Sequence, residues 1–189
     1  MKKLQILFFI GILILTSFKS HAQTKIKGVD VPGTIETEKG KLLLNGAGIR
    51  TKYIFDLYVG ALYLKEKTKD PKAVINQDSP QAIRMYIISD KITNKKMEET
   101  IKEGFEKATK GNTAPYKSKI DQLMVAFKEE IHNKDVIDII YLPGSGVKLY
   151  KNGKLKTQVE GLDFKKLLFT IWLGDEPADE DLKNRMLGK

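Results

Sequence analysis

Hydrophobic and polar residues alternate most clearly between residues 53 and 64, in the run YIFDLYVGALYL. In an extended strand, successive side chains point to opposite faces. One face of this run is almost wholly apolar and carries Tyr53, Phe55, Leu57, Val59, Ala61 and Tyr63. The other face begins with polar residues such as Asp56 and ends with Leu62 and Leu64. The pattern predicts a long central strand that is covered on both faces at its end and borders a cavity mouth at its start.

A glycine-rich segment, NGAG at residues 45–48, and a single arginine, Arg50, precede this strand. Glycine adopts backbone conformations that other residues avoid, and it allows a ligand to approach the backbone closely. We therefore predict a turn at 45–48 that leads into the central strand. Such a turn would place Arg50 at the mouth of the cavity.

The rest of the chain divides into strand-like and helix-like patterns. Strands are expected within 24–38, where Pro32-Gly33 breaks them, and at 41–44, 82–89, 135–142, 146–150 and 155–159, the last two joined at Asn152-Gly153. Helices are expected after the cap residues Asp70, Asn94 and Asp163, and at 118–130 and 178–187. Consecutive strands with grouped helices predict an α+β fold, and we expect a single domain over residues 23–189.

Residues 1–22 have the pattern of a signal peptide. Lys2 and Lys3 precede an apolar run at 4–15, and Ser20-His21-Ala22 matches a cleavage site. We predict cleavage before Gln23 and a periplasmic or secreted protein without a stable membrane anchor. An uncleaved single-span anchor is the alternative, although the apolar run is shorter than the ~20 residues that a bilayer requires.

Composition and charge narrow the function. Hydrophobic residues make up 41% and charged residues 30% of the chain, which are values of a globular protein. The net charge of +9 falls to +6 without Lys2, Lys3 and Lys19. The remaining lysines are interspersed with acidic residues, so we expect a solvated basic surface and no nucleic-acid partner. No cysteine is present, which excludes disulfides and a lipid-modified cysteine.

The residues required for common catalytic sites are missing. His132 is the single histidine after residue 22, so a His/Cys metal site or a thiol nucleophile cannot form. Ser145 lies between glycines but lacks the strand-turn-helix context of a nucleophile elbow. We therefore expect no metal, no cofactor and no catalytic set. Arg50 remains as the candidate binding group, because a guanidinium beside an apolar cleft needs an anion. That anion is either a ligand or an internal carboxylate such as Asp56 or Glu36.

Two segments, LLNGAGIRTKYIFDLYVGALYL and FTIWLGDEPADEDLK, resemble the chalcone isomerase-like family, and the resemblance extends from about Val29 to the C-terminus. It implies an open-faced β-sandwich, in which a curved antiparallel sheet is layered by helices. The isomerases of this family combine an arginine with a Thr, a Tyr, an Asn and a later Thr. Here Arg50 matches the arginine, but Tyr58, Thr93, Thr100 and Asp179 occupy the other positions, so chalcone isomerisation is not expected.

In the fatty-acid-binding members of this family, an arginine and a tyrosine hold the carboxylate. Arg50 and Tyr58 match these two residue types. In a straight strand they would lie roughly 26 Å apart. They could share one carboxylate if the chain turns or bulges near Thr51-Lys52. Otherwise Tyr58 would line the cavity while Arg50 acts with Tyr53 or alone.

Three functions follow from these observations. The first is an exported, non-enzymatic protein that binds a fatty acid or similar amphipathic carboxylate in an apolar cavity. The second is an enzyme that stabilises an enolate at Arg50, with Tyr58 or Tyr53 as its acid or base. The third is a scaffold or partner-binding module whose cavity is filled by its own side chains. The residues expected to bind the ligand are Arg50, Tyr53, Ile54, Tyr58, Leu62, Met85, Thr93, Met97 and Thr100.

Overall fold

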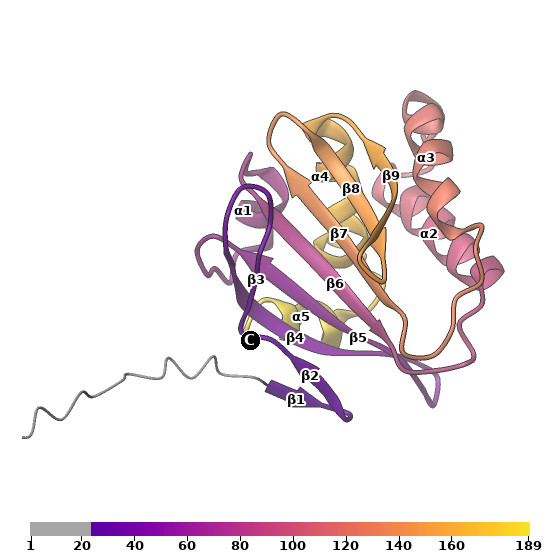
Figure 1. The fold of residues 1–189 in the computed structure, drawn as a ribbon. Coiled ribbons are helices and arrows are strands. Elements are labelled where there is room, and N and C mark those ends of the chain that lie inside the picture. Colours follow the sequence, from indigo (N-terminus) through magenta and orange to yellow (C-terminus); the bar gives the residue numbers. More distant parts are fainter. Residues whose placement is uncertain (1–23) are drawn as a thin grey trace, which may run out of the picture.

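The structure is a computed structural model that describes residues 24–189 (Figure 1). The predicted signal peptide at 1–22 and its cleavage site before Gln23 lie outside the described residues. Within residues 24–189, none of the helices combines the length and apolar character needed to cross a membrane.

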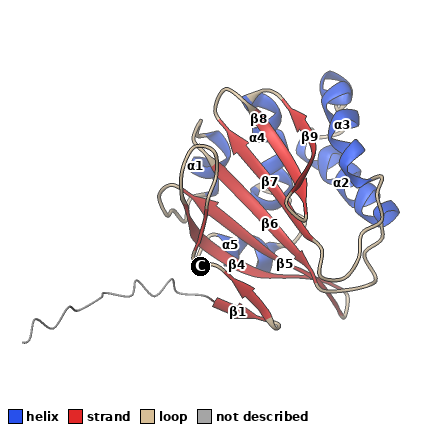
Figure 2. Ribbon diagram, in the orientation of Figure 1, coloured by secondary structure: helices blue, strands red, loops and turns tan. Residues whose placement is uncertain are grey.

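The centre of the domain is a seven-stranded antiparallel sheet whose strands follow one another in sequence order, from β3 to β9. Figure 2 shows these strands as one curled sheet. The strands are β3 (Thr34–Ile35), β4 (Leu42–Lys52), β5 (Phe55–Leu64), β6 (Gln81–Ile87), β7 (Val136–Leu142), β8 (Gly146–Lys151) and β9 (Lys154–Val159). A separate short hairpin is formed by β1 (Thr24–Ile26) and β2 (Val29–Val31).

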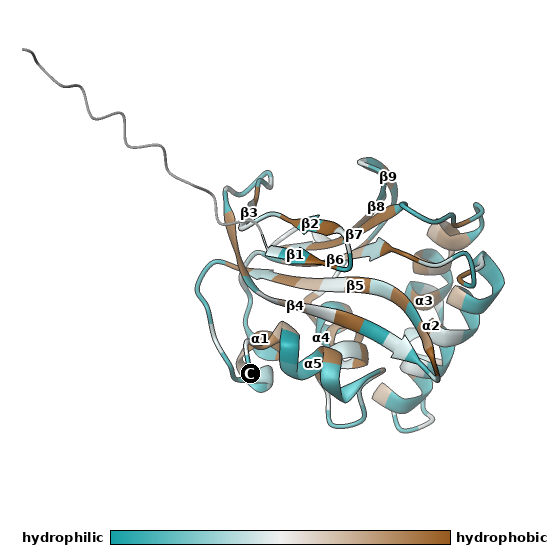
Figure 3. Ribbon diagram, turned by 90° about the horizontal axis from the view of Figure 1, so that it is seen from below, coloured by the Kyte–Doolittle hydropathy of each residue, from teal (hydrophilic) through white to brown (hydrophobic). Residues whose placement is uncertain are grey.

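The helices are inserted between strands or follow the last one. They are α1 (Pro71–Asn76), α2 (Asn94–Ala108), α3 (Lys117–Met124), α4 (Leu162–Leu173) and α5 (Glu180–Met186). Figure 3 shows α1, α4 and α5 beneath the sheet, while the β1–β2 hairpin lies over its other face. This curled antiparallel sheet with a helical layer confirms the predicted α+β, open-faced architecture.

The sheet separates two hydrophobic clusters, and β5 contributes to both. Tyr58, Leu62 and Leu64 belong to the large cluster between the sheet and the helices. Val59 and Ala61 belong to the smaller cluster on the opposite face, beneath the N-terminal strands. The second half of β5 is therefore buried on both faces, as its hydrophobic pattern predicted.

The turn predicted at 45–48 is wrong, because these residues lie inside the continuous strand β4. Helix α5 crosses β4 there and leaves no room for side chains. A Cβ atom on Gly46 would collide with the carbonyl oxygen of Arg185 and lie 2.8 Å from that of Met186, and one on Gly48 would lie 2.5 Å from the Arg185 Cβ. The glycines therefore make room for a helix, and the chain turns later, at Tyr53-Ile54.

Some predicted helix boundaries also need correction. The side chain of Thr93, rather than Asn94, caps α2 by accepting a hydrogen bond from the Lys96 N–H group. Asp163 lies within the first turn of α4, and Gly161 precedes that helix as its cap. Helix α3 ends at Met124 and continues as a short 3₁₀ turn, so the predicted 118–130 helix is too long.

Candidate functional site

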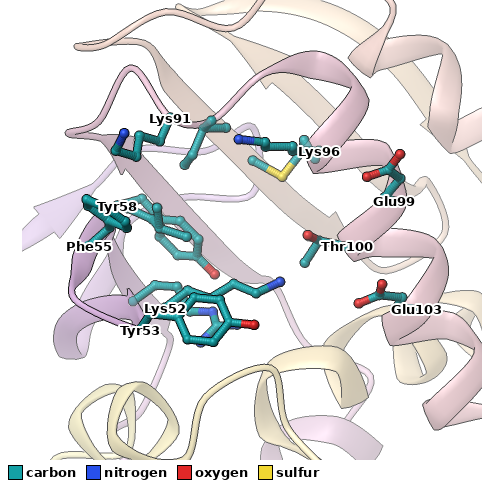
Figure 4. Close-up of a pocket in the computed structure, with 13 residues that line it drawn as sticks. Lys52, Tyr53, Phe55, Tyr58, Lys91, Lys96, Glu99, Thr100 and Glu103 are labelled. Atoms are coloured by element: carbon teal, nitrogen blue, oxygen red, sulfur yellow. The ribbon is translucent and has the colours of Figure 1, made fainter.

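A pocket of about 510 Å³ lies between the turn end of the β4–β5 hairpin and the N-terminal half of α2. Pockets of this size commonly accommodate small molecules. Figure 4 shows side chains from the hairpin on one side and Glu99, Thr100 and Glu103 of α2 on the other. The lining residues are Arg50, Lys52, Tyr53, Phe55, Leu57, Tyr58, Lys91, Ile92, Lys96, Met97, Glu99, Thr100 and Glu103.

The hairpin brings Arg50 and Tyr58 together. The chain turns at Tyr53-Ile54, and the strand register then places Tyr58 directly opposite Arg50. A register shift between Arg50 and Thr51 marks a bulge at this point. The two residues are thus cross-strand neighbours at the edge of the pocket, instead of being separated along one straight strand.

Arg50 is held by a carboxylate far away in sequence. Its Nη1 atom donates to Asp179 Oδ2 at 3.0 Å and to the carbonyl oxygen of Thr51 at 3.0 Å. Asp179 also caps helix α5, because its Oδ1 accepts a hydrogen bond from the Leu182 N–H group at 2.9 Å. Both charged side chains are largely buried, at 13% and 12% exposure. This ion pair ties the hairpin to the last helix of the chain.

The predicted alternative of an internal carboxylate partner for Arg50 is found, but the partner is Asp179 and neither Asp56 nor Glu36. Asp56 instead forms an ion pair with Lys27 at 2.9 Å, and Glu36 lies 3.6 Å from Lys41. Among the described residues, the hydrogen bonds of the Arg50 guanidinium use only Nη1. Its Nε and Nη2 groups therefore remain available as donors.

The Tyr58 side chain is buried, and its hydroxyl oxygen accepts a hydrogen bond from Trp172 Nε1 of α4 at 3.0 Å. Burial raises the pKa of Tyr58, although the Trp172 hydrogen bond and the nearby Arg50 charge oppose this effect. The phenol is therefore protonated at neutral pH and is suited to donate a hydrogen bond, not to act as a base. No acceptor for its proton is found among residues 24–189.

The charges around the pocket are unevenly distributed. Lys52 lies at the end of β4 and Lys91 in the loop between β6 and α2, close to Phe55 of the hairpin, whereas Glu99 and Glu103 lie on the α2 wall. Lys96 stands at the start of α2. In the described part of the chain, none of these five residues takes part in an ion pair. The hairpin side thus favours an anion, and the α2 wall disfavours one.

The predicted ligand-binding residues separate into two groups. Those that line the pocket are Arg50, Tyr53, Tyr58, Met97 and Thr100. The others lie elsewhere: Ile54 is at the tip of the turn, Leu62 and Met85 are fully buried in the core, and Thr93 caps α2. The inner part of the predicted cavity is therefore filled by side chains, and the open volume lies nearer the surface.

Some contacts of the site were not predicted from the sequence. Asp179 was aligned with a catalytic position of the isomerases, but its ion pair with Arg50 was not expected, and neither was the contact of Trp172 with Tyr58. Both contacts arise because α4 and α5 pack against the hairpin. Lys91 and Ile92 immediately precede the Thr93 cap of α2. Their position beside the start of a helix could therefore have marked them as candidate site residues. In the described residues, no group of three or more histidine, aspartate or glutamate side chains could hold a metal ion.

Comparisons with known proteins agree with this architecture. A fatty-acid binding protein of Arabidopsis thaliana has the same fold, with a TM-score of 0.68, 17% sequence identity, and coverage of 85% of this chain and 92% of that chain. At this identity the likeness shows the fold alone. No curated protein sequence matches the chain. The sequence profile described as chalcone isomerase-like matches residues 23–188, and the chain therefore belongs to the chalcone isomerase-like family.

Proposed function

We propose that this protein is an exported, non-enzymatic binder of a fatty acid or a similar amphipathic carboxylate. The observation that carries the proposal is the pairing of Arg50 with Tyr58 across the β4–β5 hairpin, at the edge of a pocket with apolar side chains. A guanidinium and a protonated phenol are both hydrogen-bond donors, and two donors side by side suit one carboxylate.

The carboxylate would bind on the hairpin side of the pocket. Arg50 retains free donors after its bond to Asp179, and the Tyr58 hydroxyl still has its proton to donate. Because Asp179 offsets part of the Arg50 charge, Lys52 and Lys91 would add long-range attraction for an anion to the direct hydrogen bonds from Arg50. These lysines would act as point charges, while Arg50 and Tyr58 set the orientation.

The hydrocarbon part would extend between β5 and α2. Leu57, Ile92 and Met97 supply apolar surface there. Methionine adapts its shape to flexible ligands, which suits a site for an alkyl chain. Burial of this chain would provide most of the affinity, at about 0.8 kcal/mol per buried methylene group. The fatty-acid binding protein of Arabidopsis thaliana with the same fold supports this ligand class.

A direct test compares laurate with dodecanol, which has the same chain length but no charge. Binding to the lipid-free protein would be measured by calorimetry. We expect a preference for laurate of at least about tenfold, the value of one hydrogen bond to a charged group. The Arg50→Gln variant should lose this preference but still bind dodecanol.

Two further variants control for damage to the fold. Arg50→Gln leaves Asp179 without its partner, so Arg50→Gln/Asp179→Asn removes both charges of the pair together. Lys102→Gln neutralises an exposed lysine of α2 that does not line the pocket, and it should bind like the wild type. Equal binding of laurate and dodecanol by the wild type, or no binding of either, would exclude a carboxylate site.

Export is tested separately. If residues 1–22 are removed as proposed, the intact mass of the protein purified from its host will correspond to a chain that begins at Gln23. A mass that includes the apolar run at 4–15 would instead support the single-span anchor.

A further inference from the structure

The turn of the β4–β5 hairpin carries the two most exposed large hydrophobic side chains of the described residues. Tyr53 is 88% and Ile54 85% exposed, while the next most exposed, Leu155, reaches 52%. Phe55, at 40%, continues the same surface. Single exposed apolar residues are common on proteins, but a contiguous group at a protruding turn indicates a contact surface. We call Tyr53, Ile54 and Phe55 the hairpin tip.

The backbone of the hairpin tip is not suited to its residues. Tyr53 has a φ of 58°, a conformation that favours glycine and is costly for a bulky side chain. A two-residue turn with positive φ at its first central position normally carries glycine there. Tyr53 accepts this strain, and its exposed side chain gains little packing in return. The strain therefore points to a role outside the folded chain.

Positive charge surrounds the hairpin tip. Lys52 precedes it directly, and the Lys91 Nζ atom lies 4.5 Å from the centre of the Phe55 ring. Lys96 lines the same pocket mouth as Tyr53. These three lysines have no carboxylate partner within residues 24–189, as described above. Their charges are free to meet anions outside the protein.

The nearby carboxylates do not cancel this charge at the tip. Asp56 is bound to Lys27 and also accepts a hydrogen bond from the Thr51 hydroxyl at 2.8 Å. Glu99 and Glu103 lie on the α2 wall, across the pocket from the hairpin. Asp90 is adjacent to Lys91 in sequence, and within residues 24–189 it forms no ion pair.

We propose that the hairpin tip docks on an anionic phospholipid bilayer. Tyr53 and Ile54 would enter the headgroup region, where tyrosine is a favoured side chain. Lys52, Lys91 and Lys96 would bind lipid phosphates, and their aliphatic stems would lie along the surface. The same residues border the pocket mouth, so docking would place that mouth against the lipid. A role of docking in ligand uptake rests on the proposed function, whereas docking itself does not.

A second copy of the chain fits this surface less well. A two-fold symmetric contact would place the same patch on both sides of the interface. Lys52, Lys91 and Lys96 would then face their own copies, and like charges that meet at an interface are costly. An anionic bilayer has the opposite charge, and the exposed apolar side chains of the tip can insert between its headgroups.

The test is sedimentation of the lipid-free protein with phosphatidylcholine vesicles, with and without about 30% phosphatidylglycerol to give an anionic surface. We expect binding to the anionic vesicles that weakens as salt is raised. Ile54→Ser should weaken it about tenfold, because a large apolar side chain no longer leaves water. Its matched control is Leu155→Ser, an exposed leucine on β9, which should bind like the wild type.

Charge is tested with two matched triple variants. Lys52→Gln/Lys91→Gln/Lys96→Gln should weaken vesicle binding about a hundredfold, at roughly fivefold for each lysine near the surface. Lys102→Gln/Lys107→Gln/Lys110→Gln removes the same charge from exposed positions on and just after α2 and should change binding by less than about threefold.

Several outcomes would overturn the proposal. One is that the wild type does not bind anionic vesicles. Another is that both triple variants lose the same amount of vesicle binding, and a third is that Leu155→Ser weakens vesicle binding as much as Ile54→Ser does. Sedimentation velocity showing a dimer that Ile54→Ser dissociates would assign the hairpin tip to a second copy instead. Ile54 does not line the pocket, so Ile54→Ser should still prefer laurate to dodecanol, and Arg50→Gln should still bind vesicles. The two proposals can therefore fail independently.

Discussion

Two hairpins of the same sheet use their turn residues differently. The β8–β9 hairpin turns at Asn152-Gly153, where φ is 51° and 75°, and both residues tolerate these values. Asn152 also accepts a hydrogen bond from the Val136 N–H group at 2.8 Å. The β4–β5 hairpin turns at Tyr53-Ile54, which suit the turn poorly. The difference supports the proposal that the β4–β5 turn serves a contact surface, whereas the residues of the β8–β9 turn match its backbone conformation.

The two hairpins also place their glycines differently. The β8–β9 hairpin has Gly153 in its turn, where a Cβ atom would meet nothing within 4 Å. The β4–β5 hairpin has Gly46, Gly48 and Gly60 within its strands, facing α5. Glycine in the β8–β9 hairpin permits the backbone conformation of the turn, whereas glycine in the β4–β5 hairpin permits a short distance between α5 and the sheet.

The largest effect that separates the hairpins is expected from Gly46→Ala. The added methyl group would meet backbone carbonyl groups of α5, which cannot rotate away, so we expect a loss of about 3 kcal/mol in unfolding free energy. Gly153→Ala is the matched control, since only its positive φ is disturbed, and it should cost about 1 kcal/mol. Urea unfolding measures both. Equal losses would mean that α5 does not hold Gly46 closely.

A smaller effect of opposite sign is expected from Tyr53→Gly. Glycine relieves the strained φ, and the exposed tyrosine ring makes little packing, so unfolding free energy should rise by about 0.5 to 1 kcal/mol. The same variant should dock more weakly on anionic vesicles. The reverse change in the other hairpin, Asn152→Tyr, should destabilise the protein. A less stable Tyr53→Gly variant would show that the tyrosine has a structural role, and the positive φ of Tyr53 would then no longer indicate a contact surface.

The sequence predicted the elements whose information is local. The Asn152-Gly153 hairpin, the Asp70-capped helix and the buried second half of β5 all depend on neighbouring residues, and each was found. The glycines of β4 were misread, because the helix that requires them lies about 140 residues later in the chain. The pattern of β5 identified which residues face inward. The pattern could not show that Leu62 is buried in the core while Tyr58 lines the pocket, because the burial of each inward-facing side chain depends on how α4 and α5 pack against the sheet.

The smallest expected effect is a pH dependence at Asp135, which precedes β7 and accepts a hydrogen bond from Asn152 in the β8–β9 turn. Burial acts to raise the pKa of Asp135, but hydrogen bonds from Asn152, the His132 N–H group and Lys151 outweigh it and hold this pKa below its usual value. The folded state therefore binds this proton less readily than the unfolded state. The resulting stability is present above the unfolded pKa of about 4 and is lost as pH falls through the lower folded value.

We expect this contribution to be below about 1 kcal/mol, because the burial of Asp135 opposes the hydrogen bonds that lower its pKa. Asp135→Asn should be less stable than the wild type near neutral pH, and the difference should shrink as pH falls below about 4. Urea unfolding at a series of pH values measures it. Lys151→Met, which removes the charged partner 3.1 Å away, should shrink the same acid-dependent difference. If the difference in stability between Asp135→Asn and the wild type stays constant down to low pH, the charge of Asp135 contributes nothing. Its hydrogen bonds to the Asn152-Gly153 turn would then stabilise the protein without any contribution from ionisation.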